Sequence, residues 1–310
     1  MKNKKILAVA LGVAFTAAAA YFSWIYLQDL QEKIRQHLAE KMLLERKHQA
    51  WVILRQTVEN EMNSFNGDAG IIIKDLKNNW EIDYQKDKLF PSASLAKIPI
   101  MAACFQAIRD AKLSLNDTIV LKASCKVPGS GRLKNMPSGT PLTVEELLEL
   151  MITESDNTAA NMIIGLLGFD YLNSYFKENG LEKTNLSRKM MDFRCRKQGI
   201  ENYTTAEDIT SILEKIYKKK FINAQISGQC LRILKDQKIN DRIPKKLPQD
   251  AEVAHKTGLE NNVCHDAGIV FTEKGDFLIC VLTRHPGRSG PAKRFISDIA
   301  LNTYKYYQQF

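Results

Sequence analysis

The sequence lacks several motifs that would assign it to a common class of protein. Its six cysteines show neither C-x-x-C spacing nor a Cys/His ligand pattern, so we expect no zinc site. No nucleic-acid-binding motif is present, and no cysteine follows the apolar N-terminal run to serve as a lipoprotein anchor. Nothing in the chain implies a metal or an organic cofactor. Export would permit disulfides, but the spacing of the cysteines does not give their pairing.

Low-complexity tracts, internal repeats and long blocks of one charge are absent as well. The 310 residues carry a net charge of +9 that is spread along the chain. This distribution indicates a solvated basic face, or attraction to an anionic envelope surface. The composition, 45% hydrophobic and 25% charged, is that of a globular protein. The length is sufficient for one large hydrophobic core or two modest ones.

Charge is missing from a run of 22 residues near the N-terminus, Ile6–Leu27. Such a run is long enough to span a bilayer as a helix. Lys2, Lys4 and Lys5 precede it, so the positive-inside rule places the N-terminus inside and the rest of the chain outside. We therefore predict a single-pass protein of the cell membrane whose main domain is extracytoplasmic, in the periplasm or at the cell surface.

The N-terminal run also fits a cleavable signal peptide, because Ala18–Ala20 suit a cleavage site. We favour an uncleaved anchor, since the run continues through Trp24 and Tyr26, which suit a membrane interface. Apolar residues then recur at a four-residue step, but the repeat is too short to establish a coiled-coil dimer. The oligomeric state stays open. The chain thus divides into an anchor or signal peptide, a helical stalk and a main domain, at residues 1–27, 28–50 and 51–310.

Strand patterns lie at both ends of the main domain, and helical patterns lie between them. The predicted strands are residues 69–76, 80–85, 252–258, 265–271 and 277–283. The first two form a hairpin, and most segments between residues 94 and 235 have helical period. A helix is predicted at the C-terminus. We therefore expect an α/β (α+β) fold, in which helices flank an antiparallel sheet and an all-helical subdomain is inserted.

Ser94 precedes Lys97 by three residues at the start of an apolar helical segment, so the two side chains share one helix face. A serine hydroxyl becomes a nucleophile when a base takes its proton. Lysine can be that base if burial or a neighbouring cation lowers its pKa. A helix start also offers unpaired N–H groups, so the Ser94 N–H can bind an oxyanion. One S-x-x-K pair is weak evidence, because Ser174 and Lys177 also match and are interpreted as helix surface.

Two triplets extend this pattern, Ser155-Asp156-Asn157 and Lys256-Thr257-Gly258. The set S-x-x-K, S-D-N and K-T-G, in this order, is that of class A β-lactamases and penicillin-binding proteins. The chain therefore resembles the class A β-lactamase family, and the segments "FPSAS", "AHKTG", "HDAGIV" and "ENYTTAEDI" are similar to it too. The resemblance covers roughly residues 50 to 310. It implies a β-lactamase/transpeptidase-like fold with the active site between the sheet domain and the helical subdomain.

The resemblance also implies three catalytic roles. Ser94 would be acylated by a β-lactam or by an acyl-D-Ala-D-Ala peptide, and Lys97 would take its proton. Ser155 would relay a proton to the leaving nitrogen, although it also suits a cap for the helix that begins near Asn157. Asp156 is expected to point inward and brace its loop.

Substrate-binding roles fall, by the same resemblance, on five residues: Asn157, Lys256, Thr257, Gly258 and Leu259. The asparagine would bind the side-chain amide, the lysine and threonine would receive the carboxylate, and the leucine N–H would complete the oxyanion site. The glycine would leave the edge strand open to the substrate. Arg284 would either add to carboxylate binding or, in the interpretation we favour, form a solvent-exposed strand end. His255 and His265 are interpreted as packing or hydrogen-bonding residues, because no G-x-S-x-G elbow calls for a Ser-His-Asp triad.

One part of the family pattern is missing. Class A β-lactamases resemble one another in an omega-loop motif, E-x-x-L-N, whose glutamate activates the deacylating water. The corresponding stretch here is "LSRKMMDFRCRKQGIENYTT", where Arg188–Asp192 stand in the place of the loop arginine and glutamate. A methionine cannot activate water. Asp192 and Glu201 are alternative bases, one shorter than glutamate and the other away from the expected position.

Two functions therefore compete at this point. The first is a membrane-anchored serine hydrolase that opens β-lactams at some rate. The second is a D-alanyl-D-alanine peptidase-like penicillin-binding protein, or a β-lactam sensor, that is acylated with little turnover. The cytoplasmic end of about five residues is too short for a signalling domain, so a sensor would need a partner within the membrane.

Overall fold

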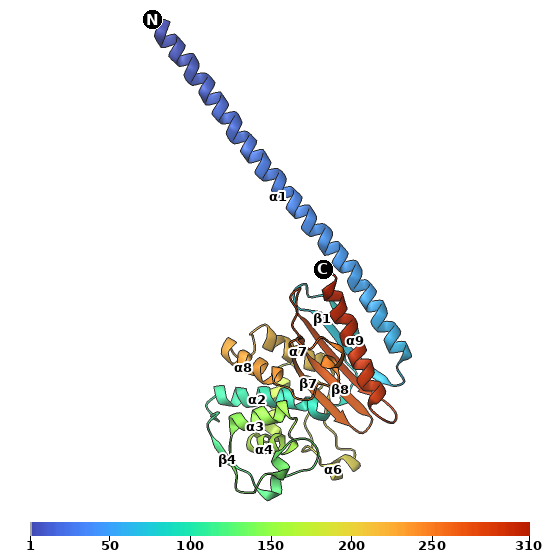
Figure 1. Ribbon diagram of the computed structural model, residues 1–310. Helices are drawn as coiled ribbons and strands as arrows, with labels where there is room; N and C mark the ends of the chain where they lie inside the picture. Colours follow the sequence, from blue (N-terminus) through green and yellow to red (C-terminus); the bar gives the residue numbers. More distant parts are fainter. Residues whose placement is uncertain (1) are drawn as a thin grey trace. The chain divides into compact units, whose positions relative to one another are not determined.

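The computed structural model describes residues 2–310 and contains two compact units, Met1–Leu54 and Arg55–Phe310 (Figure 1). The first helix, α1, runs over Lys2–Ser64. Within the described residues it is the one helix long and apolar enough to cross a membrane, with a mean hydropathy of 2.0 in its apolar window. This composition is typical of a membrane anchor and of a signal sequence alike. The boundaries expected after residues 27 and 50 fall inside α1 and stay predictions.

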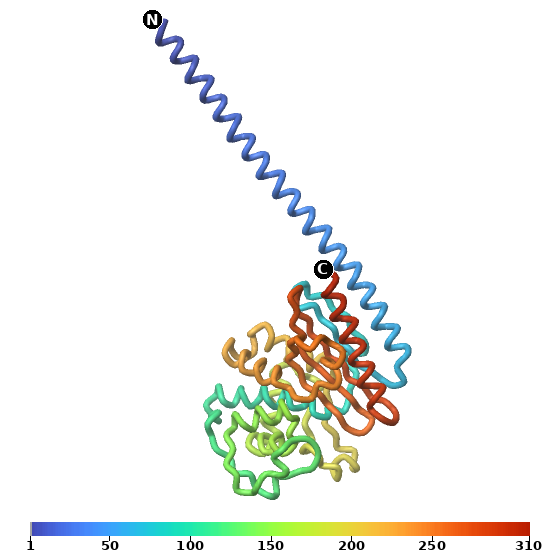
Figure 2. Tube along the Cα trace, viewed as in Figure 1, coloured from blue at the N-terminus to red at the C-terminus, as the bar shows by residue number. Residues whose placement is uncertain are grey.

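The second unit is built on a five-stranded antiparallel sheet with the order β2-β1-β9-β8-β7. Its strands are β1 (Asp68–Asp75), β2 (Glu81–Tyr84), β7 (Val253–Glu260), β8 (Val263–Val270) and β9 (Phe277–Arg284). β1 pairs with β9 along its whole length, so the two ends of the domain lie side by side (Figure 2). The predicted strands, the initial hairpin and the antiparallel sheet are confirmed.

Both faces of the sheet are covered. Every residue of β8 is buried, and so is every residue of β9 except Arg284. Since successive strand residues point to opposite faces, helices must cover both sides. α7 (Ala206–Tyr217) and α9 (Gly290–Gln308) pack on the sheet. The last turns of α1 pack in this unit as well, because Phe65, just past the helix, stacks on Phe295 with ring centroids 4.3 Å apart.

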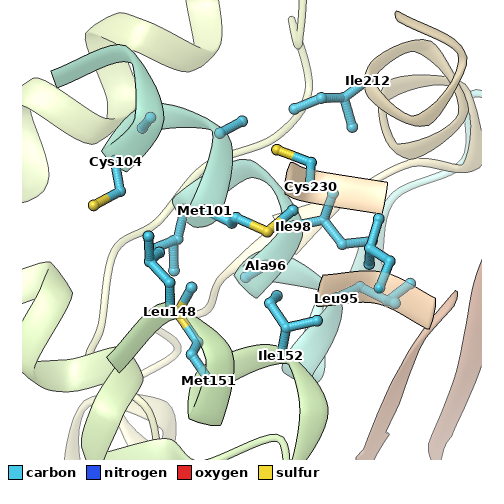
Figure 3. Close-up of a cluster of buried hydrophobic side chains, with 14 of the residues drawn as sticks. Leu95, Ala96, Ile98, Met101, Cys104, Leu148, Met151, Ile152, Ile212 and Cys230 are labelled. Carbon is cyan, nitrogen blue, oxygen red and sulfur yellow. The ribbon is translucent and has the colours of Figure 1, made fainter. Parts of the chain in front are cut away.

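The inserted subdomain is helical. Its helices are α2 (Lys97–Arg109), α3 (Val144–Thr153), α4 (Asn157–Leu167), α5 (Phe169–Glu178), α6 (Phe193–Lys197) and α8 (Ala224–Lys235). The shorter elements are β3 (Phe90–Pro91), η1 (Ala93–Ala96), β4 (Thr118–Val120), η2 (Ala123–Cys125), η3 (Leu133–Asn135), β5 (Pro141–Thr143), β6 (Tyr203–Thr204) and η4 (Ile243–Lys246). In Figure 3, Ile98 and Met101 of α2 lie in a buried apolar cluster with Leu148 and Met151 of α3 and Ile212 of α7. This cluster fixes α2 at the centre of the domain.

Helix α4 begins at the asparagine of the S-D-N triplet and has a different cap from the one considered above. Capping by Ser155 is wrong, because the N-cap of α4 is Asp156, whose Oδ1 accepts a hydrogen bond from the Ala159 N–H at 3.0 Å. An N-cap residue needs extended backbone dihedrals, and Asp156 has them. Ser155 instead has a φ of 54°, in the left-handed region. Its hydroxyl is therefore available for other contacts.

Candidate functional site

Ser94 lies in the 3₁₀ turn η1, directly before α2, rather than in the first turn of the α-helix itself. It is partly exposed, whereas its neighbours Ala93 and Leu95 are buried. Ala93 has a φ of 45°, which is unfavourable for a residue with a Cβ and costs on the order of 1 kcal/mol. The surrounding structure must therefore enforce the conformation of Ala93, the residue directly before Ser94.

Lys97 is the central contact of the site. It is fully buried, and its Nζ lies 3.2 Å from Ser94 Oγ, 2.7 Å from the Ser155 carbonyl oxygen, 3.2 Å from Ser155 Oγ and 2.8 Å from Asn157 Oδ1. Burial lowers the pKa of Lys97 to about 7, and the negative charges of Asp156 and Glu260 oppose this shift. A large fraction of this amine is therefore neutral near pH 7 and able to accept a proton.

A second buried lysine, Lys256, also contacts Ser155. Its Nζ lies 2.9 Å from Ser155 Oγ and 2.8 Å from the Thr257 carbonyl oxygen. Burial lowers its pKa well below the usual lysine value, and the nearby Lys97 and Arg242 add to the effect. Ser155 Oγ therefore lies between two buried lysines, Lys97 at the start of α2 and Lys256 on β7. Such a hydroxyl can pass a proton from one side to the other.

Asp156 points away from this centre, as expected. One carboxylate oxygen caps α4, and the other accepts from the Leu133 N–H at 2.9 Å. Gly131 lies so close that a Cβ on it would be 2.1 Å from Asp156 Cγ, so only glycine fits there. Asn157 is placed by the same loop, because its N–H donates to the Ser130 carbonyl at 3.2 Å.

The K-T-G triplet lies on β7, an edge strand that pairs only with β8 in the described part of the sheet. Thr257 is buried, and Leu259 is 47% exposed. A Cβ on Gly258 would lie 3.4 Å from the Ala93 Cβ and 3.2 Å from the His265 ring, so glycine allows β7 to lie against η1. The unpaired edge of β7 is thus next to the Ser94 turn. It leaves backbone groups free for a strand-like ligand.

The two histidines beside these strands make structural hydrogen bonds. His255 Nδ1 lies 2.9 Å from Asp266 Oδ1, and its Nε2 lies 3.0 Å from Asn240 Oδ1. The Thr283 N–H donates to His265 Nδ1 at 3.0 Å, and burial lowers the pKa of His265 to about 4. No hydrogen bond links either ring to Ser94 among the described residues, so the two histidines are interpreted, as before, as structural.

The loop expected to carry a deacylating base is fixed to α4. The Met190 N–H donates to Asn161 Oδ1 at 2.8 Å, and Asn161 Nδ2 donates to the Met190 carbonyl at 3.1 Å. Asn161 lies one helical turn beyond Asn157, the partner of Lys97. Asp192, one of the alternative bases, instead caps the short helix α6 through the Cys195 N–H.

The other alternative base, Glu201, belongs to a group that we name the arginine–glutamate cluster: Arg188, Arg196, Glu201 and Glu260. Arg188 contacts Glu201 at 2.6 Å and Glu260 at 3.0 Å, and its side chain is 2% exposed. Arg196 contacts the same two carboxylates at 3.2 and 3.3 Å. Glu201 is thus engaged in two ion pairs. The cluster joins the loop to the end of β7, two residues beyond Gly258.

Replacing Arg188 by alanine is expected to lower the free energy of unfolding by about 1–3 kcal/mol, because two carboxylates lose their buried partner and keep only the partly exposed Arg196. Urea denaturation of the two proteins would measure the difference. Lys189→Ala is the matched control, since it removes a cation from an exposed neighbour in the same loop and should change stability by no more than about 0.5 kcal/mol. Equal urea midpoints for Arg188→Ala and the parent would contradict the importance of the cluster.

Sequence reasoning missed Asn161, Glu260, Arg196 and Arg242. Asn161 gave a usable signal, since it lies four residues after Asn157 on the same helix face. The sequence gives no such signal for Arg242, which is fully buried and contacts Cys264 Sγ at 3.1 Å. Within residues 2–310, no group of three His, Cys, Asp or Glu side chains is arranged to hold a metal ion, and all six cysteines are free thiols.

This sheet, with its helical insertion and its paired serine and lysine motifs, has the architecture of the β-lactamase/transpeptidase-like serine hydrolases. The model of the Beta-lactamase enzyme family, Beta-lactamase2, matches residues 53–307, and the chain belongs to this family.

Similar proteins include β-lactamases and PBP-A. Beta-lactamase VEB-1 of Pseudomonas aeruginosa is 25% identical over 267 residues, which cover 81% of this chain and 89% of VEB-1. A beta-lactamase structure from Sphaerobacter thermophilus has a TM-score of 0.76 at 29% identity, covering 84% of this chain and 98% of that one. A point mutant of PBP-A, in an acyl-enzyme complex with penicillin G, has a TM-score of 0.77 at 27% identity, covering 84% and 97%. The family match and the similarity to these distant relatives identify the chain as a class A β-lactamase-like serine hydrolase.

Proposed function

We propose that the chain is a membrane-anchored, extracytoplasmic serine hydrolase that is acylated on Ser94 by β-lactams and hydrolyses them at some rate. One observation carries this proposal. The buried Lys97 amine contacts Ser94 Oγ, Ser155 Oγ and Asn157 Oδ1 at once, with a pKa lowered to about 7. A buried lysine with this pKa, next to a partly exposed serine, fits a general base beside its nucleophile.

In the proposed acylation, Lys97 Nζ takes the proton of Ser94 Oγ while this oxygen attacks the carbonyl carbon of the β-lactam. The tetrahedral intermediate collapses, its carbon–nitrogen bond breaks, and the leaving nitrogen receives a proton through Ser155 Oγ. The Ser94 and Leu259 N–H groups would stabilise the negative oxygen. Removing one such donor typically costs about 100-fold or more in rate.

Substrate binding is assigned to β7 and the S-D-N loop. Lys256 and Thr257 receive the substrate carboxylate, and Asn157 binds the side-chain amide. Gly258 keeps the free edge of β7 close to Ser94, so that the substrate can lie along the strand. The exposed Leu259 side chain leaves this edge accessible.

A second candidate is a penicillin-binding peptidase or sensor that is acylated by an acyl-D-Ala-D-Ala peptide or a β-lactam with little turnover. The state of the loop favours it. Met190 cannot activate water, Asp192 caps α6, and Glu201 is held in two ion pairs. The likeness to PBP-A, a mutant of which has been captured as an acyl-enzyme with penicillin G, supports acylation in this fold.

Anchoring is proposed from the apolar part of α1. The three lysines before it orient the domain outward, either in the periplasm or at the cell surface. A cleavable signal sequence would export the same domain without the anchor.

The function is tested by mixing the domain, residues 45–310, with a chromogenic β-lactam and following colour and intact mass together, with Ser94→Ala as control. Sustained colour that the control abolishes indicates hydrolysis. A single burst with a lasting adduct on Ser94 indicates the peptidase or sensor. Neither colour nor adduct would refute the proposed chemistry.

The acylation rate should depend on pH through Lys97. The pKa of this lysine is lowered to about 7, and its neutral form is the base. The second-order rate constant of Ser94 acylation should therefore be level above pH 7 and fall about tenfold per pH unit below it. Mass spectrometry of the adduct between pH 5 and 9 would measure this profile. A profile still rising at pH 9 would show that Lys97 keeps an ordinary pKa.

A further inference from the structure

A cleft of about 760 Å³ lies next to the end of β7 that follows the K-T-G triplet. The β7–β8 turn, the loop around α6 and the segment after β9 line it. Leu259, the first lining residue of β7, directly follows Gly258. A ligand that lies along β7 with its carbonyl at Ser94 can therefore extend into this cleft.

One part of the lining is apolar. Phe193 is 44% exposed and Leu259 is 47% exposed, and Met191 lies beside them with partial exposure. Large apolar side chains that are exposed in a concave place are available to contact a ligand. This part suits a short hydrocarbon chain or an apolar amino-acid side chain.

The other part is positively charged. The lining residues include three cations, Arg196, Arg288 and Lys293, and one anion, Glu260. Glu260 is neutralised within the arginine–glutamate cluster. Lys293 is 2.6 Å from Asp241, but Arg288 is exposed and, across residues 2–310, has no carboxylate within ion-pairing distance. Arg288 is therefore free to bind an anion from the ligand.

An unpaired polar atom lies in the same wall. His285 lines the cleft and is 4% exposed, and its Nε2 has no hydrogen-bond partner among the described residues. This Nε2 atom is shielded from solvent, so a ligand in the cleft does not reach it directly. The polar character of this end of the cleft therefore comes from the exposed Arg288.

We propose that the cleft binds the acyl side chain of the substrate and selects side chains that combine a short apolar part with a terminal carboxylate. The apolar part lies against Phe193 and Leu259, and the carboxylate is bound by Arg288. This inference rests on the proposed function, because it takes Ser94 as the acylated residue. The inference adds a substrate class to that function: acyl groups that carry a free carboxylic acid at the end away from the reacting carbonyl.

The test compares two probes that differ by one charge, the adipoyl derivative of 7-aminocephalosporanic acid and its methyl ester on the adipoyl carboxyl. The second-order rate constant of Ser94 acylation is measured for each by intact mass. The parent should react with the acid about tenfold faster than with the ester, as one charge-assisted contact at an exposed site would give. In Arg288→Gln this preference should disappear while the ester reacts at the parental rate.

Arg284→Gln is the matched control, since it removes an exposed arginine four residues away that does not line the cleft. It should keep the preference for the acid. In the parent the preference should also shrink at 1 M salt, where charges are screened within about 3 Å. Equal rates for acid and ester in the parent, or an unchanged preference in Arg288→Gln, would overturn the inference while the proposed function stands. If neither probe acylates Ser94, the proposed function fails and the inference with it.

Discussion

Replacing Lys97 by alanine is expected to slow acylation of Ser94 by about 10²–10⁴-fold, the contribution typical of a positioned general base. Its amine is the proposed base, and in the structure it also contacts Ser155 and Asn157. The measurement is the rate at which the β-lactam adduct appears by intact mass at pH 8. Lys97→Arg should not restore the rate, because arginine stays protonated at this pH.

The chain supplies its own control for this experiment. Ser174 and Lys177 repeat the S-x-x-K spacing on α5, and both are exposed. Lys177→Ala should leave the acylation rate unchanged within about twofold, the change that a few tenths of a kcal/mol produces. Acylation of Lys97→Ala at the parental rate, in a variant whose thermal unfolding is normal, would rule out Lys97 as the base.

Replacing Met190 by glutamate is expected to shorten the lifetime of the Ser94 adduct by about 100-fold or more, because it supplies a general base for water. The Met190 backbone is held by Asn161, one turn of α4 beyond Asn157. These hydrogen bonds fix the Met190 backbone to the helix that also carries Asn157, a partner of Lys97. The measurement follows the loss of the adduct mass after excess β-lactam is removed.

Two variants of the same loop serve as controls for this gain of turnover. Lys189→Glu places a carboxylate on an exposed neighbour and should leave the adduct lifetime unchanged. Met191→Glu places the carboxylate one residue further along the loop. The present Met191 side chain lies close to Gly129, since its Cε would be 3.1 Å from a Cβ added to that glycine. If the Met190→Glu variant is acylated but its adduct persists as long as that of the parent, residue 190 does not lie where water reaches the acyl group.

The parts of the fold that depend on local patterns were predictable from the sequence. The five strands follow from runs of β-branched residues between turn signals, and the helical insertion follows from its period. The exposed strand end at Arg284 was also predicted. The choice of Asp156 over Ser155 as the cap of α4 was not, because both residue types suit an N-cap and only the backbone dihedrals distinguish them.

The site itself depends on contacts between distant segments, and these were accessible through the family resemblance alone. Lys256 reaches Ser155 across 101 residues of sequence, and no local pattern indicates such a pair. The arginine–glutamate cluster was missed for the same reason, since Arg188 and Glu260 are 72 residues apart. A sequence shows that Glu260 is charged, but not that its partners are Arg188 of the loop and Arg196 of α6.

The pairing of β1 with β9 has a consequence for how the chain acquires its structure. Residues 68–75 are made early, but their partner strand, residues 277–284, is made only after the whole helical insertion. Contacts of such long sequence separation slow folding, because the loop between them must be closed first. Until then β1 has only β2 beside it, and a two-stranded hairpin is marginal in water. We therefore expect the nascent domain to stay open until β9 has been made, and to close in one late step.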